Sequence, residues 1–409
     1  MNYSFKLIKE NNIVFTTKIK VLEHLGSQTP EFINITFSEQ KNTMNITWIT
    51  SPLFTKSVVQ FIHTKDFEMS GFTGNSLKEE IGTSTEHAFK AGEAQVHSVT
   101  LNGLDSGQSY TYRVGDGTEN GWSEEGSFTA DPIKANEQFS FIIMGDTQCP
   151  PNQTENGFAL FTELLTHAKK ENEDAATVIH VGDMVDDGNL YNHWAAFFES
   201  IKSKYLAPST PIIPAVGNHE NTGNGVETFK KLFKMPINGP KNFIGTVYSF
   251  DYGDAHFAVL NTETTKTGLL EQAEWLKRDM SETSKLWKIV VYHRSPYNAN
   301  TEAGSEMVKE VWTKVFDELQ IDLSLSGHDH SYFRTFPLKG DATDKEGTTY
   351  IIAGLTGHKF YGATHQSYMD VCFNEKMQVY LNVFIVGNRL KLIVKTRDGR
   401  IVDEYILEK

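Results

Sequence analysis

Cysteine is scarce in this sequence of 409 residues, which contains only Cys149 and Cys372. Two thiols form at most one bridge, and neither belongs to a Cys-x-x-Cys pair, so a disulfide framework and a dithiol redox motif are excluded. Long apolar runs are absent too, since no stretch approaches the roughly 18 apolar residues of a membrane-spanning helix. The first twenty residues contain neither the apolar segment nor the cleavage site of a secretory signal. We therefore expect a protein without a membrane partner, cytoplasmic by default, or secreted if the natural chain begins earlier.

Basic residues are outnumbered, because 38 Lys and Arg stand against 52 Asp and Glu and the formal net charge is −14. The charges are spread along the chain and are not gathered in a tail. Binding to a nucleic-acid backbone depends on clustered Lys and Arg, so we expect no partner of that kind. A hydrophobic content of 39% is typical of a globular protein. At this length the chain exceeds one ordinary core, which predicts two or three domains.

Up to Pro132 the sequence has the pattern of an all-β sandwich, in which short alternating strands are separated by Gly, Asn and Ser. The run LNGLDSGQSYTYRVG resembles the tyrosine corner of a fibronectin type III domain, with Tyr110 at the corner. We expect a fibronectin-like domain at residues 29–132, behind an N-terminal extension at residues 1–28. The predicted strands of this part are Met44–Thr50, Ser57–His63 and Gln95–Leu101, with Phe15–Leu22 as an added edge strand.

From Pro132 onward strands alternate with helices, which indicates βαβ units in a second domain at residues 133–409. The segment Ser305–Leu319 places its large apolar side chains on one face and predicts a helix. After Thr349 the sequence returns to β-structure, with a hairpin turn at Gly387–Asn388. The other predicted helices are Phe158–Lys170, Trp194–Lys204 and Leu270–Met280, and the predicted strands are Phe139–Met144, Thr177–Val181, Ile212–Val216, His256–Leu260, Lys288–Tyr292 and Asp322–Leu325.

Five of these strands are followed directly by residues that can bind a metal, four of them after a Gly. Carboxyl ends of parallel strands lie along one crevice, so these side chains would converge there. A Gly permits the sharp turn that brings a short side chain close to an ion. A single Gly-Asp is usually only a turn, but five such ends in order indicate a metal site. The ends carry Asp146, Asp183, Asn218, His293, and His328 with His330.

The order of short motifs in these ends (GD, GDxx, GNHE, VxxH and GHxH) resembles the dinuclear metallophosphoesterase superfamily. The purple acid phosphatase-like branch resembles this chain most. Gly217–Glu220 reads GNHE, Gly327–Arg334 reads GHDHSYFR, and a fibronectin-like domain precedes them. The resemblance extends over residues 29–409 and implies an α/β catalytic domain with a β-sandwich core flanked by helices. It also implies a hydrolase of phosphate esters with a binuclear metal centre.

Carried over residue by residue, the resemblance implies that Asp146 and His330 hold a first ion and that Asp183 bridges both ions. Oxygen and imidazole ligands without a thiolate suit Fe, Mn or Zn. In such sites a metal-bridging water or hydroxide is the nucleophile, and the ions clamp the phosphoryl oxygens. The second ion would be held by Asn218, His293 and His328.

At the first ion the chain departs from its relatives. The purple enzymes have a Tyr in GDxxY whose phenolate binds ferric iron, and here that position is Asp186. The wider superfamily has a His in DxH, and here that position is Gln148. Either residue, or a water, would complete the first ion, and the reading that both merely lie nearby stays open. We expect Gln148 to reach the metal or its bound water, with Asp186 behind it.

The resemblance also implies substrate contacts. His219 would face the phosphate and stabilise the charge that develops in the transition state. Relatives have a further histidine downstream of VxxH as a candidate proton donor, whereas none stands between Arg294 and Gly327 here. The nearest later candidates are His358 and His365, in a Gly-rich stretch that we expect over the crevice. Each is either a substrate contact or an ordinary loop residue.

The leading expectation for function is a phosphomonoesterase of the acid phosphatase kind, acting on a small phosphate ester. The same metal core serves phosphodiesterases, so hydrolysis of a cyclic nucleotide or another diester is the alternative. A third reading is an inactive binding protein that uses the sandwich as its working surface, because the first metal site is atypical. The presence of the other ligands argues against that third reading. The sequence does not indicate an oligomeric state.

Overall fold

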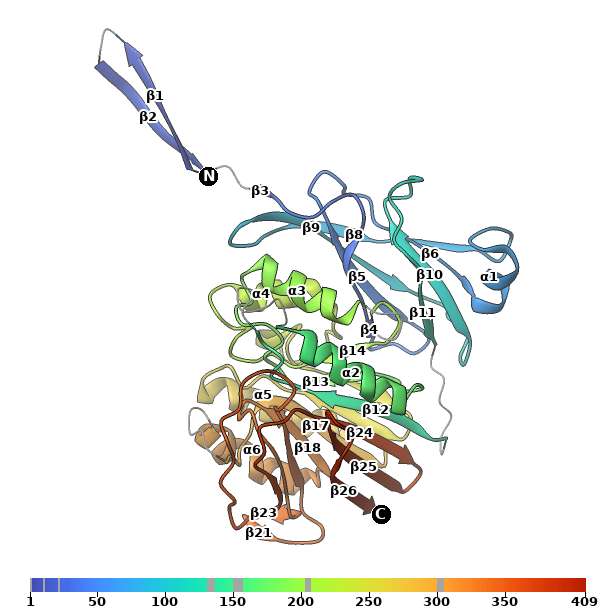
Figure 1. The fold of residues 1–409 in the computed structure, drawn as a ribbon, viewed down its shortest axis with the longest axis vertical. Coiled ribbons are helices and arrows are strands. Elements are labelled where there is room, and N and C mark those ends of the chain that lie inside the picture. The colour runs from blue at the N-terminus through green and yellow to red at the C-terminus, as the bar shows by residue number, and fades with distance from the viewer. Residues whose placement is uncertain are drawn as a thin grey trace.

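A computed structural model describes residues 2–9, 12–20, 23–130, 137–149, 157–202, 207–299 and 305–409. In Figure 1 an all-β domain lies above a larger domain of sheets and helices. The predicted domain boundary at Pro132 falls outside the described residues. None of the helices in the described ranges combines the length and the apolar character needed to cross a membrane.

The N-terminal domain consists of two facing sheets, which confirms the expected all-β sandwich. The helix α1 (Thr64–Ser70) is its one departure from β-structure among the described residues. The first sheet has the order β11 (Gly126–Thr129), β10 (Ser109–Gly115), β6 (Val58–His63) and β7 (Lys78–Ile81). The second has the order β3 (Glu23–His24), β9 (Gly92–Leu101), β5 (Met44–Thr50) and β4 (Glu31–Phe37), with β8 (Thr83–Ala88) also on β9.

Between the two sheets lies a small core of large side chains. Tyr110 is fully buried there, and its Oη accepts the backbone N–H of Asp105 at 2.9 Å. This is the bond that a tyrosine corner makes to backbone a few residues upstream. The likeness to a fibronectin type III domain rests on this corner and on the two-sheet arrangement.

The N-terminal extension forms a hairpin of its own. The strand β1 (Asn2–Lys9) pairs with β2 (Asn12–Lys20) in a separate two-stranded sheet that projects from the sandwich in Figure 1. The expectation that Phe15–Leu22 adds an edge strand to the sandwich is therefore wrong, and Leu22 itself lies outside the described residues. Strands adjacent in sequence close the shortest loop and pair with each other first. The edge position next to β9 is occupied by the short β3.

The second domain is built on two mixed sheets. Its strands run from residue 139 to residue 408. One sheet has the order β14 (Ile212–Pro214), β13 (Val178–His180), β12 (Phe139–Met144), β24 (Val379–Val386), β25 (Arg389–Thr396) and β26 (Ile401–Glu408). The other has the order β15 (Tyr248–Tyr252), β16 (Ala255–Val259), β17 (Trp287–Arg294), β18 (Leu323–Gly327), β22 (Thr349–Ala353), β19 (Tyr332–Thr335) and β23 (Met369–Phe373). A small ribbon, β20 (Leu338–Lys339) with β21 (Ala342–Thr343), lies apart from both.

These two sheets pack face to face, and helices cover their outer faces, as the resemblance implied. Phe141 of β12 meets Phe257 of β16 edge to face, with ring centroids 5.4 Å apart. The helix α6 (Ser305–Leu319) has the bounds predicted from its apolar period. The short amphipathic α4 was missed by the sequence analysis. The other helices are α2 (Ala159–Glu171), α3 (Tyr191–Ile201), α4 (Gly225–Leu232) and α5 (Lys266–Glu282), with a 3-10 turn at Lys241–Phe243.

The five strands that lead to candidate ligands do not belong to one sheet. β12, β13 and β14 run parallel in the six-stranded sheet, whereas β17 and β18 run parallel in the seven-stranded sheet. The single crevice expected along one parallel sheet is thus replaced by a site between two sheets. Both sets of carboxyl ends still meet there, because the two sheets pack face to face with these strand ends on the same side of the sandwich.

The N-terminal domain docks on the catalytic domain through polar side chains of β4 and β5. Thr47 donates to the carbonyl of Leu232 at 2.6 Å, and Asn45 donates to the carbonyl of Lys234 at 3.1 Å. Asn34 makes a further bond to the Leu232 carbonyl at 3.1 Å. The acceptors are backbone groups at and beyond the end of α4, so the sandwich closes off carbonyls that a helix terminus leaves unpaired.

Candidate metal centre

The candidate ligands lie together at the strand ends, in two groups that share one residue. The ligand atoms of Asp183, His293 and His328 lie within 4.8 Å of one another, and so do those of Asp146, Asp183 and His330. Asp183 belongs to both groups, which is the position that a bridging carboxylate requires. The two groups define a second and a first half-site, respectively.

The backbone at four of these ligands adopts a left-handed conformation that residues other than glycine rarely take. The φ angles are 54° at Asp146, 55° at Asp183, 73° at His328 and 44° at His330. Left-handed backbone costs on the order of 1–3 kcal/mol per residue and persists where the surrounding structure enforces it. Here it turns the chain back after β12, β13 and β18 and directs the side chains of these four residues into one crevice.

Two glycines show how tightly these turns are packed. A Cβ on Gly217 would lie 2.1 Å from Oδ1 of Asp183, and a Cβ on Gly327 would lie 2.4 Å from Oδ2 of Asp146. Real Cβ atoms do not approach other atoms so closely, so any side chain at either position would displace a candidate ligand. These two glycines therefore allow the neighbouring loops to come close to Asp183 and Asp146.

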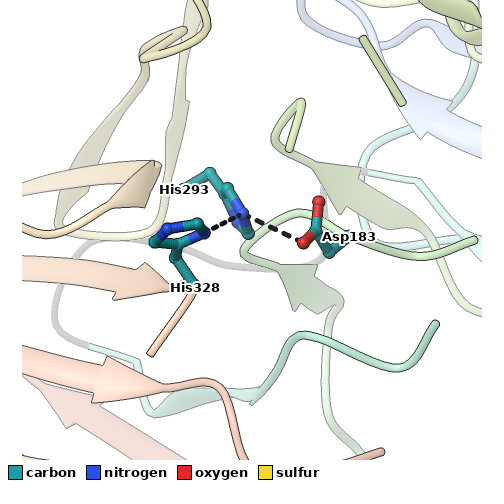
Figure 2. Close-up of side chains that lie close together, drawn as sticks. All are labelled: Asp183, His293 and His328. Atoms are coloured by element: carbon teal, nitrogen blue, oxygen red, sulfur yellow. Dashed lines mark hydrogen bonds and ion pairs between the residues drawn. The ribbon is translucent and has the colours of Figure 1, made fainter. Parts of the chain in front are cut away.

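In the second half-site His293 occupies the centre (Figure 2). Its Nε2 lies 3.2 Å from Oδ2 of Asp183, 3.2 Å from Oδ1 of Asn218 and 3.3 Å from Nδ1 of His328. Its Nδ1 donates to the carbonyl of Val181 at 3.0 Å. A ring whose Nδ1 carries the proton presents the Nε2 lone pair to a metal, and the carbonyl fixes that orientation. All four candidate ligands of the second ion therefore converge.

In the first half-site Asp146 and His330 face each other with Asp183 beside them. Nε2 of His330 lies 3.7 Å from Oδ1 of Asp146, a separation that leaves room for an ion between them. Both side chains are buried. Asp146 accepts the backbone N–H of His328 at 3.0 and 2.8 Å, which ties the loop after β18 to the loop after β12.

Gln148 lies inside this half-site, and Asp186 lies at its margin. The amide nitrogen of Gln148 is 3.1 Å from Oδ2 of Asp183 and 3.2 Å from Nε2 of His330. By contrast, Oδ1 of Asp186 is 3.5 Å from Nζ of Lys359 and 3.6 Å from Nδ1 of His219. The geometry thus favours Gln148 over Asp186 as the residue that reaches the first ion, and that assignment remains a prediction.

Unpartnered buried atoms test whether a cation fits here. Among the described residues, Oε1 of Gln148 and Nδ1 of His330 are buried without a hydrogen-bond partner. An unpaired buried polar atom is costly, so such atoms indicate a place where a water or an ion binds. Together with the two carboxylates and the imidazole nitrogens, this donor set fits a pair of divalent ions.

Burial and neighbouring charges determine protonation in the cluster. Burial raises the pKa of Asp146 well above its ordinary value, and the nearby Asp183 adds to that rise. Burial opposes the charge on His293 as well, but its bond to Asp183 raises its pKa to about 10. Burial, with the charge of His293 acting in the same direction, lowers the pKa of His328 to about 3. A bound cation would offset the buried carboxylates and would use the lone pairs of the imidazoles.

Glu220 is a residue whose role the sequence analysis missed. Its buried carboxylate accepts the backbone N–H groups of Asp183 and Met184 at 2.8 Å, Gly217 at 2.9 Å and Val185 at 3.1 Å. It therefore joins the loop that carries Asp183 to the loop that carries Asn218. The only signal in the sequence is its place in the GNHE motif. Burial raises the pKa of Glu220 to about 7, with Asp183 adding to the rise.

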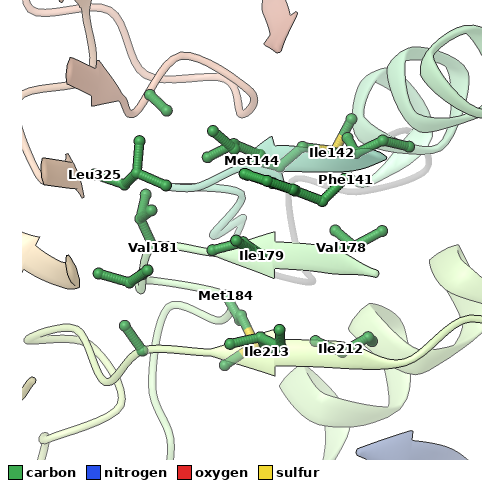
Figure 3. Close-up of a cluster of buried hydrophobic side chains, with 14 of the residues drawn as sticks. Phe141, Ile142, Met144, Val178, Ile179, Val181, Met184, Ile212, Ile213 and Leu325 are labelled. Atoms are coloured by element: carbon green, nitrogen blue, oxygen red, sulfur yellow. The ribbon is translucent and has the colours of Figure 1, made fainter. Parts of the chain in front are cut away.

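A buried apolar layer fixes the strands that carry these loops (Figure 3). Ile142, Ile179 and Ile213 lie on the adjacent strands β12, β13 and β14, and all are fully buried. Met184, in the loop after β13, lies in the same layer. β-Branched side chains suit such strands, because they pack on a pleated surface with few rotamers. The rigid layer lets short side chains at the strand ends hold fixed positions.

The histidines expected to contact substrate lie in different places. Nδ1 of His219 donates to the carbonyl of Asp186 at 2.7 Å, and its Nε2 lies 3.9 Å from Oδ2 of Asp183. His358 is exposed and bonds to the carbonyl of Gly157, and His365 is exposed as well. The Gly-rich stretch does cover the crevice, because Tyr361 packs on His330 with ring centroids 4.5 Å apart. A role for His358 or His365 stays a prediction.

Comparison with family models divides the chain as the fold does. Residues 139–332 match the calcineurin-like phosphoesterase family, and residues 30–130 match the purple acid phosphatase N-terminal domain. The second match describes the β-rich domain more closely than the fibronectin label does. Both candidate half-sites lie within the first match.

Whole-chain relatives cover both domains. Acid phosphatase type 7 of Mus musculus is 27% identical over 84% of this chain and 81% of its own length. A protein named probable inactive purple acid phosphatase 1, from Arabidopsis thaliana, is 26% identical over 77% of this chain and 58% of its own length. The solved structure of purple acid phosphatase PPD1 from yellow lupin seeds superposes with a TM-score of 0.76. The superposition covers all of this chain and 79% of the lupin chain, with 18% sequence identity. At this identity the similarity concerns the fold alone.

Proposed function

The chain belongs to the calcineurin-like phosphoesterases, in their purple acid phosphatase-like branch, and on this basis we propose that it is a metal-dependent phosphomonoesterase. The resemblance drawn from the five strand ends is thereby confirmed. The observation that carries the proposal is Asp183, which belongs to two groups of ligand atoms at once. A carboxylate in that position serves a two-ion centre and has no comparable use in a one-ion site.

In this proposal Asp146 and His330 hold the first ion, Asp183 bridges, and Gln148 completes the first half-site. When bound there, two such ions would supply an activated water and would neutralise the oxygens of the phosphoryl group. The metals are divalent Mn, Zn or Fe, because oxygen and imidazole donors suit them and no phenolate stands at position 186. The second ion is held by Asn218, His293 and His328.

His219 is the proposed contact to the substrate phosphate. Its backbone N–H donates to Oδ1 of Asp183 at 3.0 Å, which fixes its position beside the bridge. Its Nδ1 donates to the Asp186 carbonyl, so its Nε2 edge is the one left for the crevice. In the protonated ring that edge donates to a phosphoryl oxygen and stabilises the charge that develops there.

The proposed substrate is a small phosphate monoester. The test loads the protein with Mn²⁺ or Zn²⁺, measures the metal content, and compares hydrolysis of 4-nitrophenyl phosphate with that of its bis-ester. We expect two ions per chain and faster turnover of the monoester. Faster turnover of the bis-ester would favour the phosphodiesterase reading. Full metal content without hydrolysis of either would favour the binding-protein reading.

A further inference from the structure

We propose that Arg294 contacts the phosphoryl group of the substrate beside the second ion, and that Glu263 holds its guanidinium in place. The inference rests on the proposed function of the site. Arg294 follows the candidate ligand His293 directly at the end of β17, and Glu263 lies on the loop between β16 and α5. Two different strand ends therefore deliver this pair to the second half-site.

Glu263 binds one side of the Arg294 guanidinium. Nε of Arg294 donates to Oε1 of Glu263 at 2.7 Å, and Nη2 donates to Oε2 at 3.2 Å. The side chains are only 15% and 8% exposed. A forked pair of this kind fixes both the position and the plane of the guanidinium. The remaining nitrogen, Nη1, is not used by Glu263.

Nη1 is directed at the second half-site. It lies 2.8 Å from Nε2 of His328, whose Nδ1 faces His293. A guanidinium has donors only, so in this contact Nε2 of His328 must be the acceptor. A neutral ring that gives Nδ1 to a metal carries its proton on Nε2, which is then a donor as well. The contact between Arg294 and His328 and the binding of a metal by Nδ1 therefore exclude each other.

Binding of the second ion by Nδ1 of His328 would consequently break the contact between Nη1 and His328. Glu263 still holds the other side of the guanidinium, so the Nη1 donors stay at the rim of the half-site. The proposed reaction brings phosphoryl oxygens to this place, and they are acceptors for which a guanidinium is well suited. Arg294 is always charged and cannot act as the proton donor, so its role is to bind and orient the phosphate.

The experiment compares wild type with Arg294→Gln, Glu263→Gln and the control Arg389→Gln. Arg389 is a half-exposed arginine paired with Glu408 at 3.2 Å, far along the chain from the site. Each protein is loaded with Mn²⁺, its metal content is measured, and inorganic phosphate is titrated by calorimetry. We expect Arg294→Gln to keep two ions and to bind phosphate about tenfold more weakly or worse, because a charge-assisted bond is lost.

The other measurements distinguish a direct contact between Arg294 and phosphate from a purely structural role. Glu263→Gln should weaken phosphate binding less than Arg294→Gln does and should raise KM for 4-nitrophenyl phosphate more than it lowers kcat. Arg389→Gln should match wild type. If Arg294→Gln fails to fold, Arg294→Lys keeps the charge without the fork and should bind phosphate with intermediate affinity.

The proposal is overturned if Arg294→Gln binds phosphate as wild type does. It is equally overturned if that variant loses the second ion but regains wild-type phosphate affinity at saturating Mn²⁺, because Arg294 would then only support His328. Wild type that binds phosphate without hydrolysing any ester would contradict the proposed function alone. In that case the phosphate titrations still decide the role of Arg294.

Discussion

The two half-sites differ in how completely the protein builds them. The second has three candidate ligands besides the shared Asp183, a carbonyl that orients His293 and the pair formed by Arg294 and Glu263. The first has only Asp146 and His330 besides Asp183, with the amide of Gln148 nearby. From this difference we expect the scaffold to hold an ion more firmly at the second half-site than at the first, where the additional donor is a neutral amide.

Support from the surrounding residues follows the same division. Glu220 accepts four backbone N–H groups and joins the loops after β13 and β14, which carry Asp183 and Asn218. The first half-site, in contrast, contains two of the buried atoms that lack a hydrogen-bond partner within the described residues, Oε1 of Gln148 and Nδ1 of His330. We therefore expect the second ion to bind more tightly than the first.

The largest effect is expected where the half-sites join. Asp183→Asn removes the charge that serves both ions, so at least one ion should be lost and turnover nearly abolished. Metal analysis and hydrolysis of 4-nitrophenyl phosphate measure this. Asp66→Asn, on α1 of the sandwich, is the matched control and should behave as wild type. Two retained ions with normal turnover would show that the bridge is wrongly assigned.

A smaller but still large effect is expected at Glu220. Glu220→Gln replaces one acceptor oxygen by a donor that faces backbone N–H groups, so the loops of Asp183 and Asn218 should loosen. Loss of such supporting contacts lowers metal affinity by roughly 10- to 100-fold. Calorimetric Mn²⁺ titration of wild type and variant gives the number, with the exposed Glu282→Gln as control. Unchanged affinity for both ions would mean that Glu220 supports the fold and not the site.

The absence of a tyrosine at position 186 should be visible by eye. Without a phenolate ligand the fully loaded protein should be colourless and active with divalent ions, as an absorption spectrum will show. A strong visible charge-transfer band would contradict this expectation and would point to Tyr361, which packs on His330. Tyr361→Phe would then be expected to remove the band.

A gain in metal affinity is expected at the first half-site. Gln148→His supplies an imidazole in place of a neutral amide, so it should tighten the weaker metal by up to about tenfold and leave turnover intact or raised. Titration of the two ions, resolved as two steps, measures this. Gln148→Ala is the companion variant and should weaken the same step. If neither variant alters the weaker step, Gln148 does not reach the metal.

The smallest effect is expected at Asp186. The ion pair between Asp186 and Lys359 is partly exposed, and such pairs contribute about 1 kcal/mol or less to stability. Asp186→Ala should therefore change turnover by no more than about fivefold. Metal content should stay at two ions. A variant that loses the first ion, together with a silent Gln148→Ala, would reverse the assignment of the two residues.

Much of the fold and of the candidate site was predictable because strand ends carry short-range signals. A buried apolar run followed by Gly-Asp marks both a strand and a possible ligand, and six candidate ligands found in this way lie together in the structure. The helix Ser305–Leu319 was predictable for a similar reason, since its apolar period is strong and local.

Long-range pairing was not predictable in the same way. No feature of β12 or β17 alone shows that they belong to different sheets, because that choice depends on strands β24 to β26 at the end of the chain. Likewise the pairing of Arg294 with Glu263 and the four bonds of Glu220 arise only when distant loops meet. An acidic residue in a loop gives no sign of its partner until the loop is placed.

The interface between the domains influences which amino-acid substitutions each domain can accept. The sandwich supplies the donor side chains, Thr47 and Asn45 among them, whereas the catalytic side supplies carbonyl oxygens of Leu232 and Lys234. Every residue type has that carbonyl, so substitutions at those catalytic-domain positions leave the acceptors in place. The catalytic domain also contributes side chains, because Oη of Tyr191 donates to Oε2 of Glu31 at 2.8 Å and Nζ of Lys234 donates to Oγ1 of Thr100 at 2.7 Å. The bonds to backbone carbonyls are therefore the part of the interface that can persist while the side chains of the catalytic domain diverge.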